Sequence, residues 1–202
     1  MGEVNKESPL PFVDYSPIMV AMKVVSIVGM AGAGKSEVAR VFQDKGFTRI
    51  RFGDVTDEEI KKRGLELTEK NERYIRELLR QEYGMAAYAK LNLPKIDAAL
   101  KHGDVVIDGL YSWEEYTFLK DYYRDDFCVV AVWASPRTRY NRLTRRAQRH
   151  LTPEEAANRD KAELENINKG GPIAMADFTI INEVPLPELQ RETERTIARI
   201  RR

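Results

Sequence analysis

The 202-residue sequence is poor in the residues that build disulfides and metal clusters. It contains one cysteine, Cys128, and two histidines, His102 and His150, which fall near expected helix ends. A single cysteine excludes an internal disulfide and a thiolate metal cluster, and two separated histidines do not favour a zinc site. The chemistry of this chain must therefore come from other side chains and from the backbone.

The sequence also lacks a dominant charge and a long apolar run. Its 33 lysines and arginines nearly balance 32 aspartates and glutamates, for a net charge of +1. This balance does not favour a nucleic-acid or membrane partner. No apolar run reaches the roughly 18 residues of a membrane-spanning helix, and the first 22 residues lack the apolar centre of a signal peptide. We expect a cytoplasmic protein, and the sequence leaves its oligomeric state open.

The chain divides into a short leader and one domain. Residues 1–21 hold three prolines and show no periodicity, so we expect an extended or mobile leader. Met1, Met19 and Met22 are all possible starts. Residues 22–202 have the length and the 43% hydrophobic content of a single domain with a buried core.

A glycine-rich segment matches G-x-x-x-x-G-K-[ST] without a mismatch: Gly29-Met30-Ala31-Gly32-Ala33-Gly34-Lys35-Ser36. It follows an apolar run and precedes an expected helix at 36–44. The alternative is an ordinary glycine turn, but the strand–loop–helix order favours a phosphate-binding loop. Backbone N–H groups and the helix start would then bind the phosphates of a nucleotide. The residues predicted to bind this nucleotide are Gly29, Ala31, Gly32, Ala33, Gly34, Lys35, Ser36 and Glu37.

Two of these residues have further predicted roles. Lys35 would reach the β- and γ-phosphates and act in catalysis, and the Ser36 hydroxyl would ligate Mg²⁺. A second metal ligand is Asp108, at the end of the apolar run Val105–Ile107, although Asp-Gly is also a common turn. Gly109 follows where hydrolytic NTPases usually place a water-activating carboxylate. This favours transfer to an acceptor over hydrolysis.

An arginine-rich helix is expected from Pro136 to about Arg149. Arg142 and Arg146 are four residues apart and would share a face, where they can neutralise the charge of a transferred phosphoryl group. The alternative is a solvated face paired with the following Glu154 and Glu155. Arg159, on the next helix, is a weaker candidate of the same kind. Six arginines lie in the stretch: Arg137, Arg139, Arg142, Arg145, Arg146 and Arg149.

Asp54 follows the second expected strand directly. Its carboxylate could accept the proton of an acceptor hydroxyl, or it could simply cap the following helix. The sequence does not separate these roles. In the insert, Arg51, Arg63 and Arg80 could bind an acceptor phosphate, although each alone is more typical of a solvated surface.

Apolar runs predict five strands, at 23–28, 47–52, 104–108, 127–133 and 178–181. Helices alternate with them, which indicates an α/β fold with a mostly parallel sheet covered on both faces. Four helices, at 55–63, 68–83, 85–92 and 94–101, form an insert between the second and third strands. A turn is expected at 170–172, and a last helix at 187–202.

These motifs resemble known families. The Gly-Lys-Ser loop, Gly53-Asp54 and Ile107-Asp108-Gly109 resemble adenylate kinases, and the segment 176–182, Ala-Asp-Phe-Thr-Ile-Ile-Asn, resembles dephospho-CoA kinases. Residues 23 to about 200 together resemble an archaeal family of adenylate-kinase-related P-loop proteins. The resemblance implies a three-layer P-loop NTP hydrolase fold with a five-stranded parallel sheet of order 2-3-1-4-5. It also implies an acceptor-binding insert at about 54–102 and an arginine-rich lid at about 137–168.

The resemblance further implies ATP and Mg²⁺ as cofactors and an adenine nucleotide as partner. By position, Arg142 and Arg146 match lid arginines, Asn182 lies in the adenine-side loop, and Asp54 lies near the general base of dephospho-CoA kinases. Three positions where these families carry acceptor-binding arginines differ here, and hold Asp57, Tyr111 and Ser112. These differences affect the expectation of AMP phosphorylation more than that of ATP binding.

The sequence thus predicts ATP-dependent phosphoryl transfer to a nucleotide or a nucleotide-like small molecule. A nucleotide-binding sensor or scaffold without efficient transfer is the first alternative, and the missing acceptor arginines support it. The second alternative is an RNA-end kinase in which the arginine stretch contacts backbone phosphates; its RNA binding would depend steeply on salt.

Overall fold

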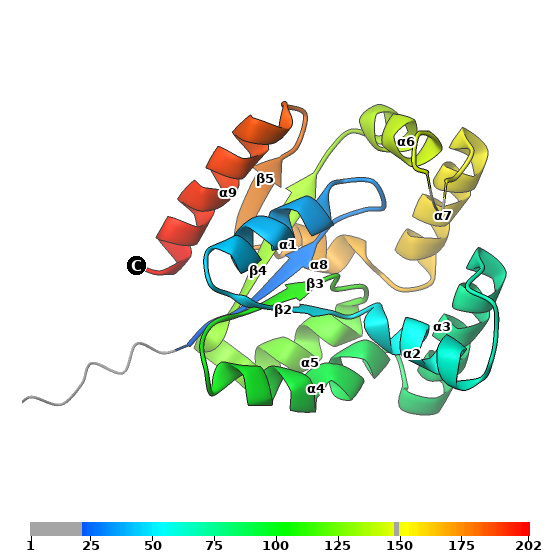
Figure 1. The fold of residues 1–202 in the computed structure, drawn as a ribbon, viewed down its shortest axis with the longest axis horizontal. Helices are drawn as coiled ribbons and strands as arrows, with labels where there is room; N and C mark the ends of the chain where they lie inside the picture. Colours follow the sequence, from blue (N-terminus) through cyan, green and yellow to red (C-terminus); the bar gives the residue numbers. More distant parts are fainter. Residues whose placement is uncertain (1–21, 148–149) are drawn as a thin grey trace, which may run out of the picture.

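The computed structural model describes residues 22–147 and 150–202. The leader expected at 1–21 lies outside these residues. Within them, strands and helices alternate along the chain, and the sheet lies between two layers of helices (Figure 1).

The sheet has five parallel strands in the order β2-β3-β1-β4-β5. Their bounds are Val24–Val28 for β1, Thr48–Arg51 for β2, Val105–Asp108 for β3, Phe127–Trp133 for β4 and Phe178–Ile181 for β5. Every residue of the central strand β1 is buried, because it pairs on both edges and is covered on both faces. The predicted fold class and strand order are confirmed.

Helices cover both faces of the sheet. On one face α4 (Ala87–Leu100) and α5 (Trp113–Tyr123) pack with the short α8 (Gly170–Ala174). On the other, α1 (Lys35–Asp44) and α9 (Leu186–Ile200) form a second core. The two cores share the strands, whose alternate side chains point to opposite faces. A short 3₁₀ helix, η1, at Arg124–Asp126 leads into β4.

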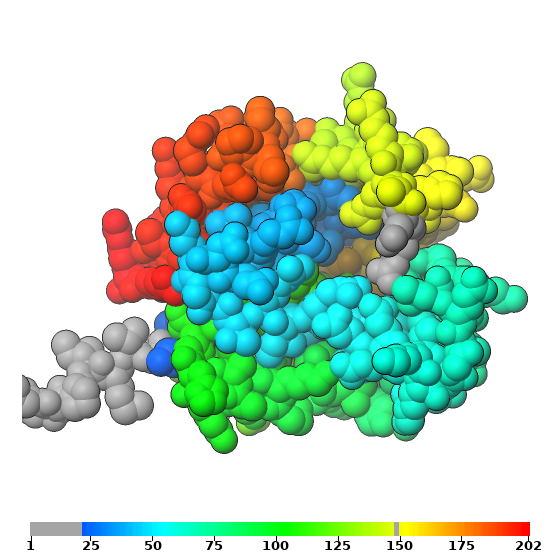
Figure 2. Space-filling model, viewed as in Figure 1, coloured from blue at the N-terminus to red at the C-terminus, as the bar shows by residue number. Residues whose placement is uncertain are grey.

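Two groups of helices project beyond the carboxyl ends of the strands. Between β2 and β3, α2 (Asp54–Lys62) and α3 (Glu69–Tyr83) precede α4, and after β4 come α6 (Pro136–Thr144) and α7 (Pro153–Glu165). Figure 2 shows a recess between these groups, next to the start of α1. In open α/β sheets the carboxyl ends of the strands are where ligands bind.

Three helical segments differ from the sequence prediction. The helices expected at 85–92 and 94–101 form one helix, α4, with Pro94 inside it. Tyr88 and Ile96 are fully buried on either side of the proline, so packing outweighs the roughly 3 kcal/mol cost of an internal proline. The expected turn at 170–172 is part of α8. The arginine-rich helix α6 ends at Thr144 instead of about Arg149, and the Leu143 carbonyl in its last turn accepts from Leu151 N (3.2 Å), outside the helix.

Candidate phosphate-binding site

The glycine-rich loop connects β1 to α1 through left-handed backbone at Gly32 and Gly34, whose φ angles are 80° and 102°. Only glycine adopts such angles without strain. Lys35 is the first residue of α1, and its Nζ donates to the loop carbonyls of Gly29 (2.8 Å) and Met30 (3.0 Å). The strand, the tight loop and the helix start therefore have the arrangement that the motif predicts.

Asn182, just after β5, connects the loop to the far edge of the sheet. Its buried Nδ2 donates to the Ala33 carbonyl (2.7 Å), and its backbone N donates to Trp133 O (2.7 Å). Arg142 Nη2 in turn donates to Asn182 O (2.9 Å). The resemblance placed Asn182 in the adenine-side loop. Here its side-chain amide holds the Ala33 carbonyl of the glycine-rich loop, and a contact with a nucleotide stays a prediction.

Gly34→Ala is expected to destabilise the protein and the loop, since a Cβ there would collide with Asn182 Nδ2. Gly46→Ala is the matched control, because Gly46 has a similar φ of 92° with nothing within 4 Å of the added carbon. Both variants carry a backbone penalty of about 1–3 kcal/mol. Only Gly34→Ala should also weaken nucleotide binding. Thermal denaturation and calorimetry measure the two effects, and equal behaviour of the variants would contradict this role of Asn182.

Ser36 and Asp108, the two predicted metal ligands, lie together. Ser36 Oγ donates to Asp108 Oδ1 at 3.4 Å, and Asp108 is 4% exposed. Its other carboxylate oxygen accepts from Arg49 Nη2 of β2. Sequence analysis missed Arg49, although Arg49 and Arg51 alternate with Ile50 and so share one face of a strand. The Ser36 hydroxyl oxygen and the Asp108 carboxylate oxygens are ligands that suit Mg²⁺.

The arginines of α6 do not form the face expected of them. Arg142 binds Asn182 as described, whereas Arg146 lies beyond the end of α6, so the two do not share a helix face. Arg139 is 4% exposed and forms a bidentate ion pair with Asp160 of α7 (2.9 and 2.6 Å). It also donates to Ala31 O (3.1 Å). The alternative of a solvated face paired with Glu154 and Glu155 does not describe Arg139 either, because its guanidinium is buried and its partner is Asp160.

A second charged cluster lies next to Lys35. Glu163 of α7 accepts from Lys169 Nζ (2.7 Å) and from Arg159 Nε (3.1 Å). Burial opposes ionisation of Glu163, but Lys169, Arg159 and Lys35 outweigh it and lower its pKa to about 2. Burial, together with the charge of Lys169, lowers the pKa of Lys35 to about 7. Of Glu163, Lys169 and Arg159, only Arg159 was a candidate from the sequence, since neither Lys169 nor Glu163 belongs to a motif.

The loops after β2 and β3 carry residues that the sequence predicted to act on an acceptor. Asp54 begins α2 and its carboxylate accepts from Arg51 Nη1 (2.9 Å), which also donates to Asp57 (3.1 Å). The Tyr111 hydroxyl lies close to Gly109 and Gly53, and burial raises the pKa of Tyr111 above its usual range. The Asp54 carboxylate is half-exposed and is paired with the Arg51 guanidinium.

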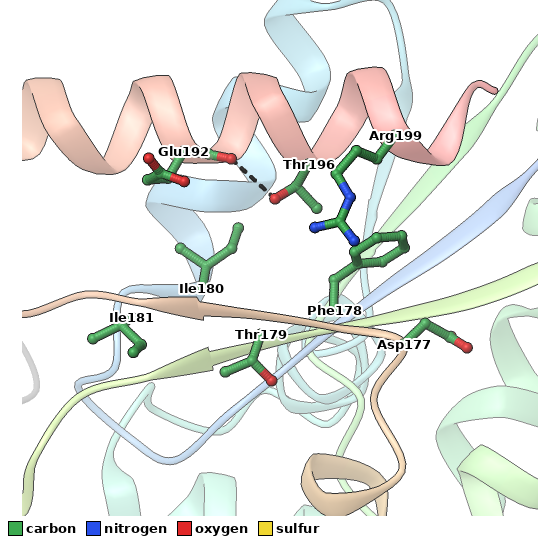
Figure 3. A pocket seen from close by; sticks show the side chains of 8 residues that line it. All are labelled: Asp177, Phe178, Thr179, Ile180, Ile181, Glu192, Thr196 and Arg199. Carbon is green, nitrogen blue, oxygen red and sulfur yellow. Dashed lines mark hydrogen bonds between the residues drawn. The ribbon is translucent and has the colours of Figure 1, made fainter.

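A separate pocket lies between β5 and α9 (Figure 3). The Arg199 guanidinium covers the Phe178 ring at 4.8 Å, and Thr196 Oγ1 donates to the Glu192 carbonyl (2.9 Å). This pocket contains no residue of the glycine-rich loop and neither Ser36 nor Asp108. It is not part of the phosphate site.

The fold and the glycine-rich loop are those of a P-loop protein. Residues 25–175 match the family model described as an AAA domain. Three solved kinases share the fold: a gluconokinase from Sinorhizobium meliloti (18% identity, 90% of this chain and 94% of that chain, TM-score 0.57), a shikimate kinase from Bacteroides thetaiotaomicron (14%, 88% and 99%, 0.58) and a dephospho-CoA kinase from Campylobacter jejuni (13%, 89% and 98%, 0.53).

The chain belongs to the family of UPF0200 proteins. It is 40% identical to the UPF0200 protein of Thermococcus kodakarensis over 182 residues, which is 88% of this chain and 97% of the relative. It is 35% identical to that of Hyperthermus butylicus, over 88% of this chain and 94% of the relative. Both relatives are archaeal. Across the described residues, every helix is too short or too polar to span a membrane.

Proposed function

We propose that this protein transfers the γ-phosphoryl group of ATP to a nucleotide or a nucleotide-like small molecule. The observation that carries the proposal is the convergence of Lys35, Ser36 and Asp108 at the start of α1, with the Ser36 and Asp108 oxygens 3.4 Å apart. A phosphate loop, a lysine and a hydroxyl–carboxylate pair are the parts that P-loop phosphotransferases use. The choice of an adenine nucleotide rests on resemblance alone.

In the proposed reaction an acceptor oxygen forms a bond to the γ-phosphorus while the bond from this phosphorus to the β,γ-bridging oxygen breaks, releasing ADP. Where the acceptor oxygen is a hydroxyl, Asp54 receives its proton, and Arg51 would release the carboxylate for this role. The loop N–H groups and Lys35 hold the β- and γ-phosphates. Arg142, in α6, and Arg146, just beyond the end of α6, are the residues that would stabilise charge on the transferred group.

The donor set suits Mg²⁺, because Ser36 and Asp108 offer hard oxygen ligands and leave positions for phosphate oxygens and water. When bound, Mg²⁺ would neutralise part of the charge that develops on the phosphates. Arg49 occupies the second oxygen of Asp108. Metal binding through that oxygen would require Arg49 to turn toward a phosphate, which its guanidinium can also bind.

The test is ADP formation from MgATP, measured with nucleosides, nucleoside monophosphates and dephospho-CoA as acceptors. We expect at least one acceptor to raise ADP formation well above hydrolysis without acceptor, and Asp108→Asn to weaken the dependence of that rate on Mg²⁺. Slow hydrolysis that no acceptor stimulates would contradict phosphoryl transfer.

A nucleotide-binding sensor is the second candidate. The ion pair of Arg49 with Asp108 favours it, because a carboxylate held by an arginine is less available to a metal. A sensor would bind MgATP tightly but produce no phosphorylated product with any acceptor. The acceptor screen and a calorimetric titration together separate the two functions.

A further inference from the structure

In the cluster beside Lys35, one carboxylate, Glu163, accepts hydrogen bonds from two cations, Lys169 and Arg159. The charge of Lys35 also acts on Glu163, and the charge of Lys169 also acts on the buried carboxyl group of Glu115. Glu69 of α3 also acts on Arg159, but it is half-exposed and already paired with Arg76 (2.7 Å). The Lys169 side chain is 2% exposed and that of Arg159 is 37% exposed, so a buried ammonium group and a partly exposed guanidinium share a single carboxylate.

Lys169 is the least expected member of the cluster. Its side chain is 2% exposed, at the start of α8, and its backbone N also donates to the Glu163 carbonyl (3.2 Å). Asn168, immediately before it, has a left-handed backbone (φ 51°), a conformation that costs free energy outside glycine. The backbone thus adopts an unfavourable conformation immediately before the residue whose side chain enters the interior.

The position of Lys169 links the two halves of the site. Its Nζ lies 5.4 Å from the centre of the Tyr111 ring, and Tyr111 borders the loops after β2 and β3. Its charge also acts directly on Lys35 of the nucleotide loop. Lys169 therefore borders Tyr111, just after β3, and its charge is felt at the glycine-rich loop.

Glu163 has the environment of a bound phosphate. Two cations donate to its two oxygens, and the charge of Lys35 stabilises it further. Lys35 meanwhile donates to carbonyls of its own loop. A carboxylate surrounded by three cations at the edge of a phosphate loop uses the same donors that a phosphate would use.

We infer that Lys169 and Arg159 form a second phosphate-binding position beside Lys35, and that the Glu163 carboxylate occupies it when no phosphate is bound. This inference rests on the proposed function, in that it takes the loop at Lys35 to bind nucleoside phosphates. The second phosphate is either the γ-phosphate of the nucleotide or the phosphate of a phosphorylated acceptor. The alternative is a purely structural Lys169–Glu163 pair that joins α7 to α8. The experiment must distinguish this role from phosphate binding.

The experiment is calorimetric titration of the full chain with MgATP and with MgADP, and with AMP after saturation with a non-hydrolysable ATP analogue. Glu163→Gln removes the competing charge and should tighten binding of the second phosphate about tenfold. Lys169→Met should weaken the same binding about tenfold or more, and Lys169→Arg should restore most of it. A change in MgATP but not MgADP identifies the γ-phosphate; a change in AMP alone identifies the acceptor.

Glu165→Gln and Lys161→Met are the matched controls, since these residues form an exposed pair on the same helix (4.0 Å) and should leave every affinity unchanged. If Glu163→Gln and Lys169→Met lower the melting temperature but leave all affinities unchanged, the pair is structural and the inference is wrong. Weaker binding in Glu163→Gln would also overturn it. Should the unaltered protein bind no nucleotide, the proposed function itself fails, which is a distinguishable result.

Discussion

Lys35→Met is expected to lower acceptor-dependent ADP formation by about 10²–10³-fold, the loss typical of removing one preorganised group that stabilises transition-state charge. Lys35 is the first residue of α1 and its ammonium group is held at the mouth of the loop. Methionine keeps the length and apolar stem of the side chain but removes the charge. The hydrogen bonds of this ammonium group go to carbonyls of its own loop. We therefore expect the melting temperature of the variant to change little.

Lys45→Met is the control for this variant. Lys45 follows the last residue of the same helix and pairs with Glu194 on the surface (2.7 Å), so its loss changes net charge equally but at the opposite end of α1. We expect its ADP formation to match that of the unaltered protein. If Lys35→Met retained full activity, Lys35 would not contact the transferred phosphoryl group.

Asp160→Ala is expected to destabilise the protein by about 3–5 kcal/mol, because it leaves the Arg139 guanidinium buried without its carboxylate. The side chains of Arg139 and Asp160 are only 5% and 11% exposed, so water cannot replace the lost partner. For a domain of this size the melting temperature should fall by about 6–20 °C. Arg139 also donates to Ala31 O of the loop, and nucleotide affinity should therefore fall as well.

Glu165→Ala provides the comparison on the same helix. Glu165 and its partner Lys161 are 61% and 71% exposed, and such pairs contribute at most about 1 kcal/mol. Chemical denaturation of both variants measures the difference directly. Equal stability of Asp160→Ala and Glu165→Ala would show that the buried pair does not join α6 and α7 as described.

The sequence predicted those parts of the site that depend on neighbouring residues. The loop, its flanking strand and the helix at Lys35 are specified within one short segment, because glycine positions and helix starts are local properties. The juxtaposition of Ser36 with Asp108 could also be predicted, since parallel strands end at one edge of the sheet. The strand order came from resemblance and was confirmed.

The remaining parts depend on contacts between distant segments. Nothing near Lys169 in the sequence indicates that it pairs with Glu163 inside the protein, because the pair requires both the turn at Asn168 and the packing of α8 against α5. The continuity of α4 through Pro94 depends on the burial of Tyr88 and Ile96 on both sides of the proline. In each case tertiary packing overrides local preference.

Calorimetric titration of the unaltered chain with MgATP, repeated with Lys35→Met, tests the central claim most directly. The account predicts saturable binding of one nucleotide to the unaltered protein, weaker binding without Mg²⁺, and a large loss of affinity in the variant. Absence of binding by the unaltered protein, or equal binding by the variant, would contradict the claim that the loop between β1 and α1 holds a nucleoside triphosphate.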